Sequence, residues 1–529
     1  MAAVNKQDSN VTGLRIAAET TIGVLPAAGT QIWNPLEPNS YADFGGTPGL
    51  TPRAPINPSR QKEKGVVTDF DADGGFNTDL TQNNLQDVLQ GFFFAGLRLK
   101  TELAVATVNT GGVTDDFEPT AGGADFTASD LLFAKGFDDT ANNGLHVVSG
   151  TPTGTEVIST STLTVATGQT GTIVRVGAQA GSGDLDVVIT GDFATVTSGG
   201  FDLRTLDLVP GEWIFLGDDT ASTFFANAEN NGPKRVRSVA TDGLSMIIDK
   251  SDLAMVAETG TGLTIRIITG RALKNENGTE ATFPILRTTY QLERLLGAPD
   301  DSNPTELQAQ YLIGAVPNTF TLNVAQGDKL NSDLGFIALD AVNALANATS
   351  TIKSEIAAAA GSVAVNSPPI VSAGGLNTAD DFKRVKMSVV STTEEAPTSL
   401  FAYIEEATLE IDNGITPNKA IGVRGGFDAS SADFSVGGSI TAYFGDLASV
   451  DAVNNNSDVS FDFFVVRSNA GMLFDIPLCA LGDGRPTVEK DEAVKLPLSI
   501  EAARATSVSS DYDHTLFAVF FDYLPNLAG

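Results

Sequence analysis

The chain has 529 residues, of which 42% are hydrophobic and only 18% are charged. This length and apolar content exclude a disordered chain and allow two to four domains with buried cores. The 65 acidic residues outnumber the 32 basic residues, which gives a formal net charge of −33. Such a surface repels nucleic-acid phosphates and anionic membranes, so the composition excludes a protein that adheres to DNA.

A single cysteine, Cys479, excludes an intramolecular disulfide framework. The N-terminal residues contain no apolar run of signal-peptide length, and nowhere do ~18 apolar residues follow one another, as a membrane-spanning helix requires. We therefore expect the chain to be made and assembled in a cytoplasm, without insertion into a membrane.

Short alternating apolar runs, separated by Gly, Asn and Asp, predict a mainly β protein in which helix is the minority element. The runs "TLEID" (408–412), "VSFDFFVVR" (459–467) and "TLFAVFFDYL" (515–524) are examples. They alternate or are apolar throughout, as strands with one or two buried faces are.

In chain order, the first local feature is a proline-rich segment between residues 52 and 64 with an excess of base. Its basic residues are Arg53, Arg60, Lys62 and Lys64. Two interpretations remain open. The segment is either a solvated loop or an extended stretch that docks onto an acidic neighbouring subunit through opposite charge.

The stretch "GVVTDFDADGGFNTDL" (65–80) follows, and Asp69, Asp71 and Asp73 precede Gly74 in the spacing that opens a calcium-binding loop. The last ligand position of such a loop would be Leu80, which offers no oxygen. The prolines before this stretch also oppose the helix that a calcium loop of this kind needs. A strand with an acidic face is therefore favoured over a metal site.

Alternation along that strand assigns its side chains to two faces. One face carries Val67, Asp69, Asp71 and Asp73, and the other carries Val66, Thr68, Phe70 and Ala72. The second face is fit for a core, so we expect the three aspartates on an exposed surface.

One helix is well indicated immediately after this strand. Thr81 can cap it, and Leu85, Val88, Leu89 and Phe92 follow at i, i+3, i+4 and i+7. Its apolar stripe is expected to pack on a sheet. A second helix is expected around residues 334–356, where Ala and Leu are frequent but the apolar stripe is irregular.

An internal repeat lies between these two helices. The stretch "DLLFAKGFDDTANNGLHVVSG" (130–150) corresponds to "DLVPGEWIFLGDDTASTFFANAENNGPKRVRSV" (207–239), and "LTVATGQTGTIVRVG" (163–177) corresponds to "LAMVAETGTGLTIRIITG" (253–270). Each unit, at about 125–180 and about 200–272, is expected to be a small barrel-like module of short strands with an Asn-Asn-Gly turn. The pair is interpreted as an insert spanning residues 106–272.

The sequence offers no catalytic or metal-ligating constellation. The two histidines are His146 and His514, and His146 aligns with Lys234 of the second repeat, which indicates an exposed strand position. There is no nucleophile elbow, no phosphate-binding glycine loop and no His-Glu-x-x-His motif. We expect no enzymatic activity, no catalytic residue, no bound metal and no cofactor.

Several stretches resemble the tail tube proteins of long-tailed bacteriophages. They are "RIAAETTIGVLPAAG" (15–29), "RQKEKG" (60–65), "GGFNTDLTQNNLQDVLQGFFFAG" (74–96), "TTYQLERLL" (288–296), "YLIGAVPNTFTLNV" (311–324), "ATLEIDNGITPNKAIG" (407–422), "FSVGGSITAYFGD" (434–446), "GMLFDIPLCAL" (471–481) and "HTLFAVFFDYLP" (514–525). Each stretch is a weak signal, but their order resembles that of the family, with the insert interrupting it.

The resemblance implies a β-sandwich or partial barrel with one flanking helix, formed by residues 1–105 and 273–529. It implies a virion structural protein of the tail, assembled in the host cytoplasm, whose inner sheets join those of neighbours into rings. The rings stack into a hollow tube that meets other tail proteins at its ends and conducts double-stranded DNA into the host without binding it specifically. Family members usually form hexamers. A trimer of duplicated domains stays open, although a single tube domain favours the hexamer.

On this interpretation, Asp69, Asp71 and Asp73 are candidates for the DNA-facing surface. Arg53, Arg60, Lys62 and Lys64 are candidates for contacts between rings or subunits, and the insert is expected on the outside of the tube. An alternative function is a surface-array or adhesive protein whose repeated β modules bind a cell-surface polymer. A polysaccharide-degrading enzyme is disfavoured, because two tryptophans and seven tyrosines provide few aromatic platforms for sugars.

Overall fold

The computed structural model describes residues 12–27, 32–53, 56, 61, 63–82, 84–110, 115–191, 193–249, 254–278, 282–297, 307–345, 352–355, 375–390 and 399–526. These residues form antiparallel strands and two α-helices, α1 (Gln86–Phe93) and α2 (Ala448–Asn454). The predicted fold class, a mainly β sandwich with a flanking helix, is confirmed. The run 459–467, predicted as a strand from its apolar pattern, is one.

Sixteen strands of the described residues belong to the first sheet. They are β1 (Gly13–Ala18), β2 (Asn34–Leu36), β3 (Pro38–Thr51), β4 (Val66–Asp79), β18 (Arg271–Lys274), β19 (Tyr290–Gly297), β20 (Gln308–Ala325), β21 (Asn331–Ala338), β22 (Asp340–Leu345), β23 (Phe382–Val389), β24 (Ile404–Asp412), β27 (Ser435–Tyr443), β28 (Val459–Arg467), β29 (Ala470–Asp483), β30 (Lys495–Ala502) and β31 (Phe517–Phe521). A separate hairpin consists of β25 (Thr416–Lys419) and β26 (Gly426–Ser430).

Thirteen strands between α1 and β18 in the sequence form the second sheet. They are β5 (Glu102–Asn109), β6 (Asp115–Pro119), β7 (Asp130–Lys135), β8 (Gly144–Val147), β9 (Val157–Ser159), β10 (Ala166–Gln179), β11 (Leu185–Thr190), β12 (Phe193–Ser198), β13 (Trp213–Leu216), β14 (Gly232–Val239), β15 (Ser245–Ile248), β16 (Glu258–Thr259) and β17 (Arg266–Ile268). These strands are called the insert below. The expected boundaries at residues 106 and 272 stay a prediction.

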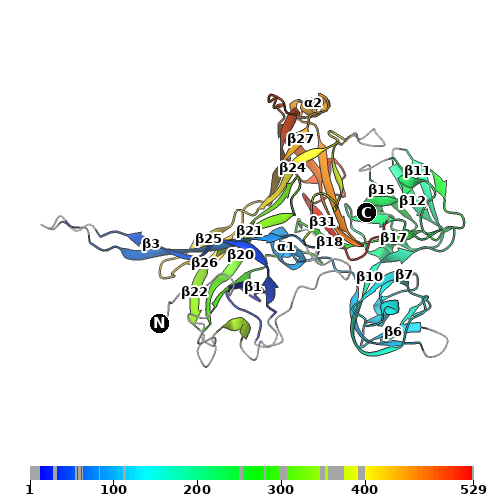
Figure 1. Ribbon diagram of the computed structural model, residues 1–529, viewed down its shortest axis with the longest axis horizontal. Helices are drawn as coiled ribbons and strands as arrows, with labels where there is room; N and C mark the ends of the chain where they lie inside the picture. Colours follow the sequence, from blue (N-terminus) through cyan, green and yellow to red (C-terminus); the bar gives the residue numbers. More distant parts are fainter. Residues whose placement is uncertain are drawn as a thin grey trace.

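Strand β4 follows the alternation expected for the acidic stretch. Phe70 and Ala72 are buried, while Asp71 and Asp73 are exposed. The first three residues of the strand are exposed on both faces, because this end of the β3–β4 hairpin projects away from the body of the protein (Figure 1). The face assignment therefore holds from Phe70 onward.

Helix α1 is also confirmed, and its apolar stripe of Val88, Leu89 and Phe92 is buried. Thr81 does not cap the helix itself. Its hydroxyl accepts a hydrogen bond from the Asn84 backbone N–H at 3.3 Å, and the Asn84 side-chain oxygen accepts one from the Thr81 N–H at 3.0 Å. This pair closes the turn that leads into the helix.

The helix expected around residues 334–356 is wrong, because the described part of this stretch begins with β21 and β22. Leu334 and Phe336 of β21 face the core, and Asp333 and Gly335 point the other way. Strand β21 pairs with β20 on one side and β4 on the other. Pairing on both edges outweighs the local helix propensity of Ala and Leu.

The first sheet folds back on itself into two layers, because two of its long strands, β20 and β29, pair with different partners along their length. The front layer consists of β3, β4, β21, the second half of β20, β24, β27, β30 and the end of β29. The rear layer consists of β1, β19, β22, β23, β28, β31 and the first halves of β20 and β29. One hydrophobic core contains side chains from both layers and from both helices.

A second core joins the rear layer to the insert. Phe463 and Val465 of β28 belong to the first core, whereas Phe464 and Val466 point the other way into the second. There they pack in a cluster with insert side chains that include Trp213. The order through the molecule is thus front layer, core, rear layer, second core and insert.

The internal repeat is visible in the insert as two strand pairs, β7–β8 and β13–β14, with equivalent turns. The side chain of Asn143 bridges the backbone of Phe137, with its oxygen 3.0 Å from the N–H and its nitrogen 2.8 Å from the carbonyl. Asn231 bridges Phe225 in the same way, at 2.9 and 2.8 Å. Pairing of β10 with β17 joins the two repeats into one open sheet.

The interpretation of His146 as an exposed strand position is wrong. His146 is 4% exposed, and its equivalent in the second repeat, Lys234, is 3% exposed. The imidazole packs edge-on against the Phe117 ring, with the ring centroids 5.4 Å apart. Burial lowers the pKa of His146 to about 4, so this histidine belongs to the core of the insert.

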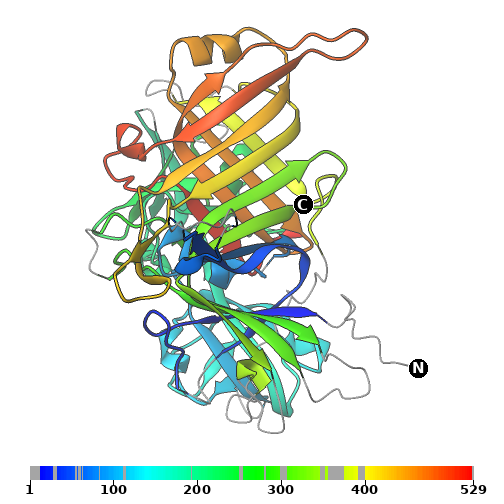
Figure 2. The same cartoon turned by 90° about the vertical axis from the view of Figure 1, so that its left-hand side faces the viewer.

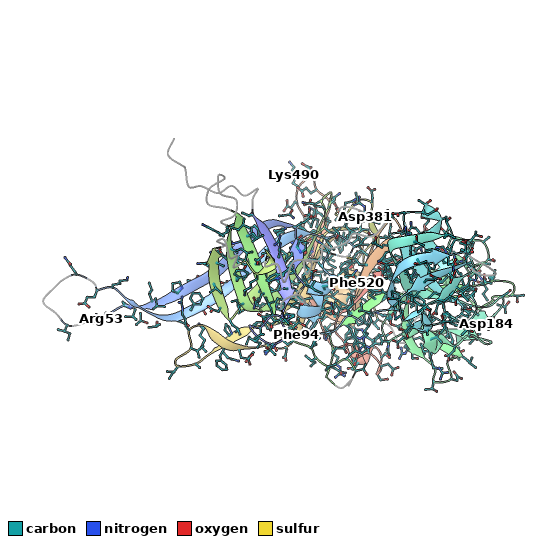
Figure 3. The ribbon with its side chains drawn as sticks, turned by 90° about the horizontal axis from the view of Figure 1, so that it is seen from below. Arg53, Phe94, Asp184, Asp381, Lys490 and Phe520 are labelled. Carbon is teal, nitrogen blue, oxygen red and sulfur yellow. The ribbon has the colours of Figure 1, made fainter. Side chains whose placement is uncertain are left out.

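We call the long, projecting β3–β4 hairpin the arm. The arm and the insert lie at opposite ends of the molecule (Figure 1). Figure 3 shows Arg53 near the tip of the arm and Asp184 near the far edge of the insert. The front layer is seen from the arm side in Figure 2, with the insert behind it.

Candidate functional site: an acidic sheet face

The outer surface of the front layer is the most extended polar feature of the fold. Its eight strands are hydrogen-bonded side by side in the order β3, β4, β21, β20, β24, β27, β30 and β29. Figure 2 shows them as a continuous sheet running from blue through green and yellow to red-orange. We call its solvent-facing side the acidic face.

Strand β24 illustrates how the sequence builds this face. Ala407, Leu409 and Ile411 are buried, and the residues between them, including Glu410 and Asp412, are exposed. Because side chains alternate across a strand, one side enters the core and the other carries only polar groups. Strands β21, β27 and β30 alternate in the same way.

Neighbouring strands place these polar side chains opposite one another. Thr321 of β20 lies opposite Glu410 of β24, and Ser439 of β27 lies opposite Ser499 of β30. The carboxylates of the acidic face are Asp43, Asp69, Asp71, Asp73, Asp79, Asp333, Glu406, Glu410, Asp412 and Glu501. Its lysines in the described residues, Lys329, Lys419 and Lys495, are each paired with a carboxylate. The net charge of the face is therefore negative.

Side-chain amides link the carboxylates across four strands. The Asn77 amide nitrogen donates to Asp333 at 2.9 Å and to Asn331 at 3.2 Å, and Asn323 donates to the same two residues at 2.9 and 3.1 Å. Asn39 donates to Asp79 at 2.6 Å. These bonds fix the side chains against the sheet and leave them fewer free donors for a passing ligand.

Two of the three aspartates predicted as surface groups share one cation. Lys419, at the end of β25, lies 2.7 Å from the Asp69 carboxylate and 2.6 Å from that of Asp71. The hydrogen bond from Lys419, followed by that from the Phe70 N–H, lowers the pKa of Asp69. No local pattern in the sequence indicates this partner, which lies 350 positions away.

Asp73 has a different environment from its two neighbours. It lines an open groove of about 330 Å³ together with Asp43, Asp333 and the backbone around Gly75 and Gly335. Partial burial raises the pKa of Asp73, and the charges of Asp43 and Asp71 raise it further. The groove thus brings three carboxylates of the acidic face together.

The basic segment lies on the arm. Arg53 is exposed near its tip and lies 3.4 Å from Glu63, and Lys64 is exposed two residues before β4 begins. Arg60 and Lys62 fall outside the described residues. The arm therefore carries positive charge away from the acidic face, at the greatest distance from the insert (Figure 3).

The potentially reactive groups of the described residues lie elsewhere and are buried. His514 and Cys479 are 0% and 1% exposed, and burial raises the pKa of the Cys479 thiol to about 12. In the part of the chain that the structure describes, no three His, Cys, Asp or Glu side chains are placed to hold a metal ion. Within the same residues, no helix is long and apolar enough to cross a membrane.

Sequence reasoning found three carboxylates of the acidic face and missed the others. The pattern that could have identified Glu410 and Asp412 was present in "TLEID", where acids alternate with core residues. Asp43, Asp79 and Asp333 carry no such local signal, because their place on the face depends on which strands are neighbours.

A family model described as "Phage tail tube protein" matches residues 9–223 and 219–502. These segments include the strands of the acidic face, the arm and the insert. Comparison with curated proteins finds no match.

Proposed function

The chain belongs to the phage tail tube protein family, and on that premise we propose that it forms rings that stack into the hollow conduit for DNA ejection. A structural role in the virion tail follows from the family itself. The ring, the stacking and the passage of DNA are the proposal. The observation that carries it is the acidic face, a continuous eight-stranded surface with paired lysines and many carboxylates.

The acidic face suits the wall of a DNA channel. Each lysine or arginine that neutralises a phosphate adds affinity and slows a sliding duplex, whereas carboxylates repel the phosphates. The described lysines of this face already bind carboxylates. We therefore assign the acidic face, with Asp69, Asp71 and Asp73, to the lumen, where double-stranded DNA passes without specific binding.

The layer order supports placing the insert on the outside of the tube. The insert packs against the rear layer through the second core, and the acidic face is the opposite surface of the sandwich. If the acidic face lines the lumen, the insert must point outward. This also fits a lumen sized for duplex DNA, roughly 20 Å across, which has no room for the insert.

The arm is the proposed contact to the next ring. Large apolar residues are exposed along it, namely Leu50 (62%), Ile56 (107%), Val66 (55%) and Val67 (50%). Such a group on a projecting hairpin indicates a surface that is covered in an assembly. Arg53 and Lys64 add positive charge that complements an acidic neighbour.

The remaining parts of the proposal concern chemistry and location. The family is structural. In the described residues, the imidazoles of both histidines and the thiol of the cysteine are buried. Both points support a protein without catalysis. Other tail proteins would meet the tube at its ends. Assembly would take place in the host cytoplasm, and the tail would be of the long, siphovirus type.

Electron microscopy of the purified protein and of virions tests the proposal. We expect rings or tubes with the insert on the outside and the acidic face around the channel. A chain that stays monomeric at high concentration and is missing from virion tails would contradict it. Density for the insert inside the channel would contradict the assignment of the faces.

A further inference from the structure

The first sheet is built twice from the same arrangement of seven strands and a helix. In chain order, the first unit consists of β1, β3, β4, α1, β19, β20, β21 and β22. The second unit consists of β23, β24, β27, α2, β28, β29, β30 and β31. The additional elements of the first unit are β2, between β1 and β3, and the insert with β18, between α1 and β19. The β25–β26 hairpin lies between β24 and β27 of the second unit.

Every strand pairing within the first unit has its counterpart in the second. The six antiparallel pairs of the first unit are β1–β19, β19–β20, β20–β22, β20–β21, β21–β4 and β4–β3. Those of the second are β23–β28, β28–β29, β29–β31, β29–β30, β30–β27 and β27–β24, in the same order. Agreement of chain order and of six pairings indicates an internal duplication.

The two units also bend at equivalent places. Strand β20 changes partner from β22 to β21 around Pro317, and β29 changes from β31 to β30 around Pro477. Proline cannot donate a ladder hydrogen bond, so it is tolerated where a strand leaves one sheet layer for another. In both units the helix follows the second strand of the front layer and contributes to the first core.

Within the chain, the two units join edge to edge. Thr319–Ala325 of β20 pair antiparallel with Glu406–Asp412 of β24. The equivalent edges of the whole chain are the end of β29, from Ala480 to Asp483, and β3. Among the described residues, Ala480–Asp483 pair with β30 alone. In the same part of the chain, β3 pairs with β4 alone. Each of these two edges thus lacks the second neighbour that its counterpart has.

We propose that the junction between β20 and β24 is repeated between chains, with the end of β29 pairing with β3 of the next copy, and that three chains close the ring. This inference rests on the proposed function. Each chain supplies two equivalent units, so the ring has six units in pseudo-sixfold order. The partner of both edges is a second copy of this chain, because an unpaired strand edge is a template for another strand and each copy offers both edges of the β20–β24 type of junction.

Barrel geometry favours three chains over six. Each chain contributes eight strands to the wall, and strands lie about 4.8 Å apart and tilt by about 40° in closed barrels. Three chains then give a backbone diameter of roughly 50 Å, and six give roughly 100 Å. Side chains extend about 5 Å from each wall, half the spacing of packed sheets. The smaller bore, roughly 40 Å, admits a duplex of roughly 20 Å without a wide empty annulus.

The sequence favoured six chains, because the chain was interpreted as containing a single tube domain. The pairings instead reveal two units whose sequences have diverged, one carrying the long arm and the other the short β25–β26 hairpin. A ring of three chains would therefore display three arms.

Disulfide cross-linking of engineered cysteines tests both the edges and the number of chains. In a Cys479→Ala background, Ala480→Cys on β29 is combined in turn with Asn39→Cys, Ser40→Cys or Asp43→Cys on β3. Directly opposed positions on antiparallel strands have Cα atoms close enough for a disulfide. The matched control places Asn323→Cys with Thr408→Cys, which are opposed within one chain.

Assembled rings are oxidised, denatured and separated by size under non-reducing conditions. We expect at least one β29–β3 combination to give a ladder of linked chains that ends at three, and the control to give single chains only. A ladder that ends at six would overturn the three-chain ring. Rings without any linked product for all three combinations would overturn the edge assignment, provided that titration of free thiols in the control shows that its intrachain disulfide has formed.

These results are separable from the proposed function. Threefold symmetry of the tube by electron cryomicroscopy supports the inference, and sixfold symmetry with six complete chains overturns it while leaving the conduit intact. Absence of rings under all conditions would instead contradict the proposed function itself.

Discussion

Arg235 of the insert lies 3.0 Å from both carboxylate oxygens of Asp475 in the rear layer, and both side chains are buried. A second carboxylate, Asp249, lies 2.7 Å from the same guanidinium. The ring of Trp213 lies against Arg235 on one side and against Arg384 of the rear layer on another. The insert is therefore held in one orientation by a buried ionic contact as well as by the second core.

Removing one partner of this contact should destabilise the protein strongly. Burial raises the pKa of Asp475, and the charge of Arg235 opposes that effect. Asp475 in an Arg235→Ala variant would be a buried carboxylate without its main partner, which typically costs about 3–5 kcal/mol of unfolding free energy. Urea unfolding of the assembled protein measures the change. Arg204→Ala is the control, because the Arg204–Asp202 pair of the insert is exposed. A loss equal to that of the control would contradict the role of the buried pair.

The shared lysine makes a specific prediction for DNA passage. Replacement of Asp69, Asp71 and Asp73 by Asn should leave the fold intact, since all three lie on the acidic face. It would release Lys419 from its two carboxylates and present a free cation to each passing phosphate. We expect DNA release from virions to slow by a factor of several, with the delay shrinking as salt rises.

The matched variant adds Lys419→Gln to the three Asn substitutions. It lacks the free cation, so DNA release should return toward the wild-type rate. No delay in either variant would show that the acidic face does not meet the DNA. Equal delays in the two variants would show that the freed Lys419 is not the cause of the delay.

Shortening the arm should separate ring formation from stacking. Joining Leu50 to its pairing partner Val67 through Asn-Gly keeps the remaining β3–β4 ladder in register and closes it with a favourable two-residue turn. We expect rings to form but tubes to be absent or very short in electron micrographs. Lys490→Glu, on an exposed loop elsewhere (Figure 3), is the control and should give tubes of normal length. Normal tubes from the shortened arm would exclude it as the contact between rings.

Local patterns in the sequence predicted the local structure well. Apolar side chains at i, i+3, i+4 and i+7 correctly predicted α1. Alternation correctly predicted the buried positions of β4 from Phe70 onward. The repeated Asn-Asn-Gly turns identified the two halves of the insert, where Asn143 and Asn231 bridge equivalent backbone groups. In each case the signal and the structure lie within one element or one turn.

Features that depend on distant partners could not be predicted. The stretch expected to be helical from residue 334 onward instead begins within β21 (Asn331–Ala338), which pairs with strands on both sides. The acidic face needs the strand order, and the Lys419 contact with Asp69 joins residues 350 positions apart. The duplication of the tube unit is a match of strand pairings rather than of residues, so one sequence did not reveal it.

Asp116 of the insert predicts how stability depends on pH. Its side chain is 5% exposed, and burial together with the charges of Glu156, Glu118 and Asp115 raises its pKa to about 6. Between pH 3.8 and about 6, the folded state therefore holds a proton on Asp116 that the unfolded state, with the ordinary carboxyl pKa of 3.8, has lost. The contribution of Asp116 to the free energy of unfolding is fully present below pH 3.8 and is lost as the pH rises to about 6.

We expect Asp116→Asn to remove this loss and to stabilise the protein at pH 7.5 by an amount on the order of 2 kcal/mol. Thermal unfolding of wild type and variant at pH 5.0 and 7.5 measures it: the difference in Tm should be larger at the higher pH. Glu156→Gln leaves Asp116 in place but removes the neighbouring charge that raises its pKa most, so the loss of stability should end at a lower pH and be smaller than in the wild type. An Asp116→Asn variant that is less stable than wild type at pH 7.5 would show that the ionised carboxylate is stabilised in the fold.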